Sequence, residues 1–153
     1  MIRKAKQLNT DSIVVAVGCY AQVSKEKLAE IEEVDLILGN NEKKEIIKYI
    51  ETFQKEKIIH LEDLMQQKDF IDFGTTVHME KTRAVIKIQD GCDRFCSYCI
   101  IPYARGRVRS RKEDDILEEV KGLVAAGYKE VVVTGIHLSS YGLDFINKEF
   151  GQQ

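Results

Sequence analysis

The amino-acid sequence predicts an α/β fold with parallel sheets, organised in two successive parts. Short apolar runs rich in β-branched residues alternate along the chain with amphipathic segments, and several of these runs end at a glycine. This alternation is typical of strands and helices that build a parallel sheet. Hydrophobic residues make up 44% of the chain and charged residues 31%, which is ordinary for a globular protein and argues against disorder.

The first half contains two predicted strands and two predicted helices. Residues 13–17 form a continuous apolar run that stops at Gly18, which predicts a buried parallel strand. Ser24 can cap a short helix that extends to residue 31. Residues 34–38 predict a second strand, and residues 41–53 carry isoleucine and phenylalanine at helical spacing.

The second half predicts one βαβ unit. Residues 54–80 carry no clear period, so we place a domain boundary near residue 80, between a domain at 1–80 and another at 81–153. Residues 83–89 and 130–134 predict buried strands. Between them Ser110 and Glu113 match a capping box, an apolar stripe follows, and Gly127 is placed to end the helix. Strand, helix and strand in this order form a βαβ unit.

Charge and hydropathy exclude some classes of protein. The net charge is −2, whereas a free-standing nucleic-acid-binding protein is usually basic, so any such contact must come from a local patch. No apolar run approaches the ~20 residues of a membrane span. The basic N-terminus lacks the apolar stretch of a signal peptide, so a cytoplasmic protein without a membrane partner is expected.

Four cysteines carry the main chemical signal. Cys92, Cys96 and Cys99 lie within eight residues, with the spacing Cys-x3-Cys-x2-Cys, and Cys19 stands far upstream. Thiolates hold iron–sulfur clusters, and three of them leave one iron of a [4Fe–4S] cube open to a chelating ligand. S-adenosyl-L-methionine has an amino and a carboxylate group suited to that iron. Zinc is the alternative, but it usually takes ligands from paired motifs, and the nearest histidine, His78, precedes the strand.

Three motifs together carry a resemblance to a known family. The cysteine loop with its context at residues 88–106, the Gly-Cys-Tyr-Ala-Gln segment at 18–22, and Thr-Gly-Ile-His at 134–137 with Tyr-Gly at 141–142 resemble the radical S-adenosylmethionine methylthiotransferases. Residues 106–111 and 135–137 are most similar to the MtaB branch. The resemblance implies a transferase that places a methylthio group on carbon 2 of N6-threonylcarbamoyladenosine beside the tRNA anticodon.

The resemblance also implies cofactors, partners and site residues. Cys92, Cys96 and Cys99 would hold the radical [4Fe–4S] cluster, and Cys19 would be one ligand of a second [4Fe–4S] cluster. The residues implied in binding S-adenosyl-L-methionine are Tyr98, Gly135 and His137. The partners would be tRNA and an electron donor, and the sulfur donor is not specified. From the residues alone, Cys19 also fits a core thiol and Tyr98 an aromatic packed under the loop.

The chain departs from the family pattern in its extent. Only Cys19 of the three cysteines expected for the second cluster has a counterpart, and 81–153 is too short for a radical SAM, partial TIM-like barrel. The resemblance therefore implies an internal fragment, the end of an N-terminal α/β domain followed by the first βαβ unit of a barrel, which would be inactive alone.

A local excess of arginines stands out between residues 92 and 112. This stretch has six basic side chains and a single acidic one, Asp93. Four of the basic residues alternate along the chain: Arg105, Arg107, Arg109 and Arg111. In an extended segment they would share one face, where they could contact tRNA phosphates or substrate carboxylates, or simply remain solvated.

Two other functions remain open from the sequence. A sister methylthiotransferase would act on isopentenyladenosine in tRNA or on an aspartate of a ribosomal protein. The other alternative is a non-catalytic metal-binding fragment, with zinc bound or as a truncated gene product. Metal analysis of the anaerobically purified protein separates the last reading from the two enzymes.

Overall fold

The computed structural model describes residues 2–72, 74 and 82–149. The chain divides into two compact units, Met1–Leu64 and Met65–Gln153. The predicted boundary near residue 80 lies outside the described residues. The segment that follows Leu64 belongs with the second unit, where the carboxylate of Asp72 pairs with the guanidinium of Arg111 at 2.6 Å.

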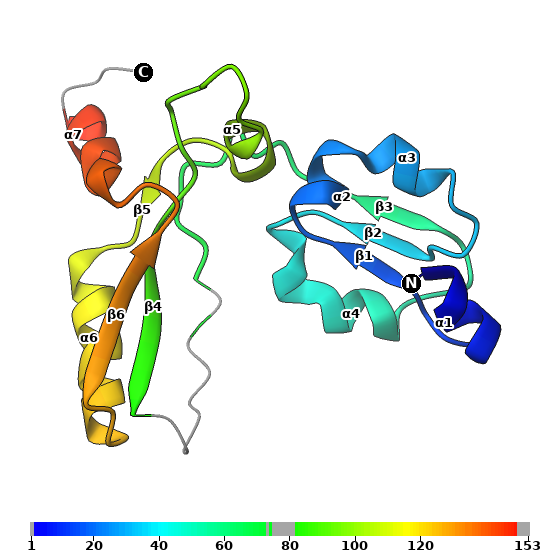
Figure 1. The fold of residues 1–153 in the computed structure, drawn as a ribbon, viewed down its shortest axis with the longest axis horizontal. Coiled ribbons are helices and arrows are strands. Elements are labelled where there is room, and N and C mark those ends of the chain that lie inside the picture. The colour runs from blue at the N-terminus through cyan, green and yellow to red at the C-terminus, as the bar shows by residue number, and fades with distance from the viewer. Residues whose placement is uncertain (1, 73, 75–81, 150–153) are drawn as a thin grey trace. The chain divides into compact units, whose positions relative to one another are not determined.

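The first unit is built on a three-stranded parallel sheet of order β1-β2-β3, formed by Val15–Val17, Leu36–Leu38 and Ile58–His60. Figure 1 shows helices on both sides of this sheet, with α2 and α3 on one side and α4 on the other. The helical elements are α1 (Ile2–Leu8), α2 (Cys19–Val23), α3 (Lys25–Ala29), the 3-10 helix η1 (Glu42–Glu45) and α4 (Ile46–Glu51). The predicted α/β class with a parallel sheet is confirmed.

Strand order decides which of the predicted strands are buried. The central strand β2 is buried at every residue, and Ile37 packs with Ala21 and Leu28 in the core. Strand β1 lies at the edge of the sheet, and Val17 is 41% exposed. The strand predicted at 34–38 is found as β2, and the prediction of a buried strand at 13–17 is wrong, because β1 is an edge strand with a neighbour on one side only.

The second unit contains the predicted βαβ unit. Strand β4 (Arg83–Asp90) pairs in parallel with β6 (Glu130–Gly135), and α6 (Glu113–Ala125) connects them. A short strand that the sequence did not predict, β5 (Arg109–Ser110), pairs antiparallel with the other edge of β4. The described strands of this sheet do not close into a barrel. Its remaining helical elements are α5 (Ile101–Arg105), η2 (Leu138–Ser140) and α7 (Leu143–Glu149).

Helix α6 covers one face of this sheet, as Figure 1 shows. Its Leu123 packs with Ala84 and Ile86 of β4 in a buried cluster. Val85, which points away from that cluster, is 57% exposed. The prediction that β4 is buried on both faces is therefore wrong, because within the described residues only one face carries a helix.

The sequence predicted the C-terminal end of α6 correctly and its N-terminal cap incorrectly. The capping-box prediction is wrong, because Ser110 lies in β5 and its hydroxyl accepts the backbone N–H of Gly142 at 2.8 Å. The helix begins instead after Lys112, which is extended. At the other end Gly127 has φ +93°, and the N–H groups of Gly127 and Tyr128 bond to helix carbonyls. This is the predicted glycine-terminated end.

The helices of the first unit are shorter than the sequence predicted. Ser24 precedes α3 but makes no side-chain capping bond, and the helix ends at Ala29. The predicted helix at 41–53 is split into η1 and α4, which ends at Glu51.

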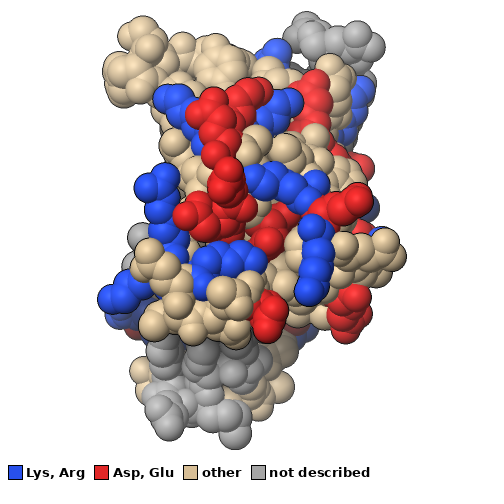
Figure 2. Space-filling view, turned by 90° about the vertical axis from the view of Figure 1, so that its right-hand side faces the viewer, with Lys and Arg blue, Asp and Glu red and all other residues tan. Residues whose placement is uncertain are grey.

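The surface agrees with the small net charge. On the face presented in Figure 2, acidic and basic side chains are interspersed rather than gathered into one basic patch. None of the described helices has the length and apolar character needed to cross a membrane.

Candidate functional site

The three clustered cysteines lie on the loop that follows β4, at the carboxyl end of this strand. Cys92 is buried, Cys99 is half-buried and Cys96 is exposed. The backbone N–H of Cys92 donates to the carbonyl of Gly106 at 3.1 Å, which ties the start of the loop to the segment after α5. The N–H of Cys99 donates to the carbonyl of Cys96 at 2.9 Å, which closes a turn between the second and third cysteines.

Gly91 permits the close approach that starts this loop. Its φ is +72°, and an ideal Cβ on it would lie 1.8 Å from the carbonyl oxygen of Arg107. No side chain fits in that space, so the backbone of the segment after α5 can pack directly against the peptide that precedes Cys92.

We expect Gly91→Ala to disorder the cysteine loop. The left-handed conformation alone costs about 1–2 kcal/mol for a residue with a Cβ, and the clash with the Arg107 carbonyl adds to it. Urea unfolding and hydrogen exchange of the loop amides measure the effect. Gly122→Ala is the matched control, because Gly122 lies inside α6 with open space around it and alanine there should stabilise the helix by about 0.8–1 kcal/mol. Equal stability changes in the two variants would contradict the role of Gly91.

Aromatic and cationic side chains pack on the same loop. Phe95 has the left-handed φ of +46°, and its ring lies edge-on to Tyr103 with ring centroids 5.8 Å apart. The guanidinium of Arg107 lies 5.3 Å from the centre of the Phe95 ring. Tyr98, in contrast, is 91% exposed, so the alternative that it packs under the loop is wrong. Its implied contact with S-adenosylmethionine stays a prediction.

The donor set fits an iron–sulfur cluster in type and spacing. Three thiols share one loop, and Cys96 and Cys99 are accessible from solvent. Among residues 2–72, 74 and 82–149, no three cysteine, histidine, aspartate or glutamate side chains already converge on a common point at metal-binding distance. A cluster would therefore require the three thiols to turn toward one another. His78, considered for the zinc alternative, lies outside the described residues.

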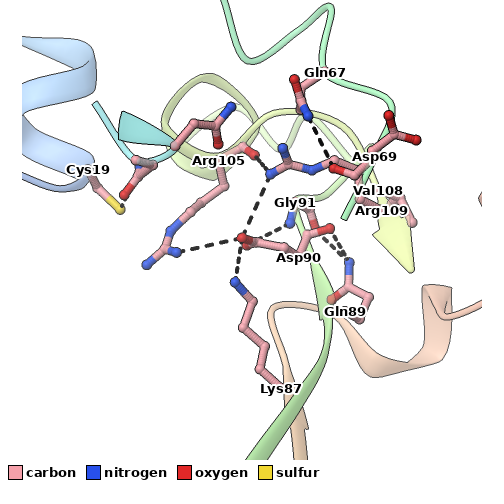
Figure 3. Close-up of polar contacts among 12 residues, drawn as sticks. Cys19, Gln67, Asp69, Lys87, Gln89, Asp90, Gly91, Arg105, Val108 and Arg109 are labelled. Carbon is pink, nitrogen blue, oxygen red and sulfur yellow. Dashed lines mark hydrogen bonds and ion pairs between the residues drawn. The ribbon is translucent and has the colours of Figure 1, made fainter. Parts of the chain in front are cut away.

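A carboxylate surrounded by cations anchors the base of the loop (Figure 3). Asp90 accepts the N–H of Gly91 at 2.9 Å through Oδ1. Its Oδ2 lies 2.5 Å from Nζ of Lys87, 3.8 Å from Nη1 of Arg105 and 3.7 Å from Nη2 of Arg109. These cations come from β4, α5 and β5, so one carboxylate joins the strand that enters the loop to the segment that leaves it.

The four alternating arginines do not share a face, which corrects the prediction of an extended basic ribbon. Arg105 ends α5, and Gly106 with φ +80° turns the chain before β5. The side chain of Arg109 is only 4% exposed, and burial lowers the pKa of its guanidinium although Asp90 opposes this shift. Arg111 is buried against Glu119 and Asp72. Arg107, with a side chain 53% exposed, is the one of the four most open to a partner.

Gly135 and His137 lie at the carboxyl end of β6. Because β4 and β6 are parallel, this is the same end of the sheet as the cysteine loop. The His137 backbone N–H donates to Oε1 of Gln89 at 2.8 Å. The ring nitrogen Nδ1 of His137 lies 2.7 Å from the hydroxyl of Ser140. The sequence did not assign a role to Gln89 or Asp90, although both directly precede the loop.

Cys19 lies in the first unit, at the carboxyl end of β1, where it begins α2 after Gly18. It is half-buried, and the side-chain amide of Asn40 donates to its sulfur at 3.7 Å. Glu42, two residues after Asn40, is buried, and its Oε1 accepts the backbone N–H of Glu62 at 2.6 Å. Polar groups thus gather where the three parallel strands end, a feature that the sequence alone did not reveal.

Comparison with known proteins shows what the chain is similar to. Residues 86–149 match the radical SAM superfamily. A threonylcarbamoyladenosine tRNA methylthiotransferase MtaB from Aquifex aeolicus (strain VF5) is 45% identical over 94% of the chain and 35% of its own length. The protein of the same name from Bacillus subtilis (strain 168) is 36% identical over 99% of the chain and 34% of its own length.

A second named group is also similar. A tRNA-2-methylthio-N(6)-dimethylallyladenosine synthase from Carboxydothermus hydrogenoformans (strain ATCC BAA-161 / DSM 6008 / Z-2901) is 39% identical over 96% of the chain and 34% of its own length. The chain thus spans about a third of the length of these relatives. The resemblance inferred from three motifs is confirmed: residues 86–149 are similar to the radical SAM superfamily, and the relatives that match most of the chain are named threonylcarbamoyladenosine tRNA methylthiotransferase or tRNA-2-methylthio-N(6)-dimethylallyladenosine synthase.

Proposed function

We propose that the chain is the cluster-binding part of a radical SAM enzyme that adds a methylthio group to N6-threonylcarbamoyladenosine beside the anticodon of tRNA. The observation that carries the proposal is the position of the three thiols. They lie on one loop at the carboxyl end of β4, beside the His137 segment at the end of β6. The names of the relatives at 36–45% identity support the substrate.

In this proposal Cys92, Cys96 and Cys99 hold a [4Fe–4S] cluster and Cys19 contributes to a second one. When bound and reduced by an electron donor, the radical cluster would supply one electron to S-adenosylmethionine, which would then give methionine and the 5′-deoxyadenosyl radical that abstracts hydrogen from the base. The part of this chain is to hold the ligand loop in place through Gly91 and Asp90. The proposal includes a cytoplasmic location and an electron donor as partner.

The contacts with S-adenosylmethionine are proposed at Tyr98, Gly135 and His137. Tyr98 projects into solvent from the cysteine loop, where its ring is open to a ligand. The ring of His137 is oriented by Ser140 through the 2.7 Å contact at Nδ1. The carboxyl end of the sheet thus places a phenol ring after β4 and an imidazole after β6, where both could contact S-adenosylmethionine.

The test is the reaction of the protein expressed from its complete reading frame, reconstituted anaerobically with iron and sulfide. With a chemical reductant and S-adenosylmethionine it should release 5′-deoxyadenosine and should convert threonylcarbamoyladenosine in tRNA to the 2-methylthio product, detected by mass spectrometry of the nucleosides. Release of 5′-deoxyadenosine without any tRNA product would indicate a radical enzyme with another substrate.

The dimethylallyladenosine relatives favour a second substrate. They are 33–39% identical to the chain, a range that overlaps the 36–45% of the first group. The same assay on tRNA that carries isopentenyladenosine decides between them, since each enzyme should modify one of the two nucleosides. Conversion of isopentenyladenosine alone would overturn the proposed substrate.

We propose that tRNA contact by the arginine run rests on Arg107. It is open to solvent, whereas Arg109 and Arg111 are buried in ion pairs. Arg107→Gln should weaken tRNA binding and reduce the slope of log affinity against log salt by about 0.7, the value for one phosphate of a single strand. Filter binding at several salt concentrations measures this slope.

Arg83→Gln is the matched control for Arg107. Arg83 is likewise exposed, and it pairs with Glu130 as Arg107 pairs with Asp93, but it starts β4 at the end of the strand far from the cysteine loop. Its replacement should leave the slope unchanged. Equal slopes in the wild type and Arg107→Gln would assign Arg107 to the solvated surface.

A further inference from the structure

The side chain of Gln89 is fully buried at the carboxyl end of β4, with 0% of the residue exposed. Its Nε2 donates to the carbonyl oxygens of Asp90 and Gly91, each at 2.8 Å, as Figure 3 shows. Its Oε1 accepts the backbone N–H of His137 at 2.8 Å. Both amide hydrogens and the amide oxygen are therefore used, so this carboxamide is matched to its three partners.

The partners belong to two separate parts of the proposed site. The Gly91 carbonyl is in the peptide group that also carries the N–H of Cys92, and that N–H bonds to Gly106 at 3.1 Å. Because the peptide group is planar, these two hydrogen bonds fix its orientation from both sides. The third partner, His137, follows β6. One side chain thus joins the first cluster ligand to the His137 segment.

The space around Gln89 is shaped for this contact. An ideal Cβ on Gly135 would lie 3.0 Å from both Cβ and Oε1 of Gln89 and 3.1 Å from its carbonyl oxygen. Any larger residue at 135 would therefore press on Gln89. A carboxylate at 89 would place negative charge against two carbonyl oxygens in a buried position, which is unfavourable. The neutral amide is the side chain that satisfies both strands.

We infer that Gln89 is a positioning residue that couples the cysteine loop to the His137 segment. The inference rests on the proposed function, because it assigns the first segment to the cluster and the second to S-adenosylmethionine. Gln89 touches neither group. It sets the position of Cys92 relative to His137, and therefore the position of the cluster relative to the bound ligand.

Gln89→Met tests this inference, because methionine has similar volume and makes none of the three hydrogen bonds. The first measurement is hydrogen exchange on the metal-free chain. The N–H of His137 and the amides of the cysteine loop should both exchange faster, while the amides of α6 keep their rates. Gln54→Met is the matched control, since Gln54 is exposed and its replacement should change neither segment.

The second measurement separates positioning from simple structural support. In the reconstituted protein from the complete reading frame, Gln89→Met should keep its iron content. Its dissociation constant for S-adenosylmethionine should rise about tenfold, which is the lower end of the loss in metal affinity or activity that follows removal of a group that orients metal ligands. The change that S-adenosylmethionine causes in the electron paramagnetic resonance spectrum of the reduced cluster should be diminished. Ile86→Val, a destabilising change in the core of the same strand, should leave affinity and spectrum unaltered.

The outcomes distinguish this inference from the proposed function. Unchanged exchange at His137 and the cysteine loop would overturn the coupling. Faster exchange with unchanged affinity and spectrum would overturn the positioning role and leave Gln89 as a structural residue, as would an equal effect of Ile86→Val. If the wild-type protein binds no cluster, the proposed function fails, and with it the positioning role, whereas hydrogen exchange still decides whether Gln89 joins the two segments.

Discussion

Cys96→Ala is expected to abolish cluster binding by the chain after anaerobic reconstitution with iron and sulfide. The wild type should bind about four irons, with visible charge-transfer absorption. Cys96 is the most exposed of the three loop cysteines and has no neighbouring thiol that could replace it within the loop. Two thiolates cannot hold a cube with one open iron, so the loss should be complete rather than partial. Iron analysis and the absorption spectrum measure it.

Cys19→Ala is the matched control for this prediction. Cys19 lies in the first unit, where the side-chain amide of Asn40 donates to its sulfur, and it is not part of the cysteine loop. Its replacement in the same chain should leave the iron content and spectrum of the loop unchanged. A stoichiometric zinc complex without visible absorption would contradict the cluster and favour the metal-binding alternative.

The sequence correctly predicted the elements that are marked by a pattern within their own residues. The apolar run of β2 and the apolar stripe of α6 predicted a strand and a helix, and Gly127 predicted the helix end. Strands β3 and β5 have three and two residues and exist through their pairing with β2 and β4. Pairing between distant segments leaves no period in so short a stretch, so these strands could not be predicted.

The site shows the same division between local and distant signals. Cysteine spacing identified the loop, because three thiols in eight residues have few structural explanations. The roles of Gln89 and Asp90 depend on partners in β5, α5 and the segment after β6. The prediction that the alternating arginines share one face was wrong for a related reason. Gly106 turns the backbone, and Arg111 is buried where it pairs with Glu119 of α6 and with Asp72.

Replacement of the buried Arg111 is expected to have the second large effect, which is on the stability of the second unit. Its side chain is only 8% exposed, and its guanidinium pairs with Glu119 of α6, whose side chain is 12% exposed, and with Asp72. Its carbonyl accepts the hydroxyl of Tyr141 at 2.9 Å. Removing one partner of a buried pair leaves an uncompensated charge, which costs about 3–5 kcal/mol. Arg111→Ala should therefore destabilise the second unit by about 3 kcal/mol or more.

Hydrogen exchange of the α6 amides measures this loss of stability in the second unit alone. Two further variants test whether the loss comes from the buried charge. Arg83→Ala removes an exposed pair with Glu130 and should cost less than about 1 kcal/mol. Arg111→Met combined with Glu119→Leu removes both buried charges and should recover most of the stability, because apolar residues of similar volume often replace a buried ion pair without loss. If the double variant is as unstable as Arg111→Ala, the cost comes from lost packing at Arg111 rather than from the charge left on Glu119.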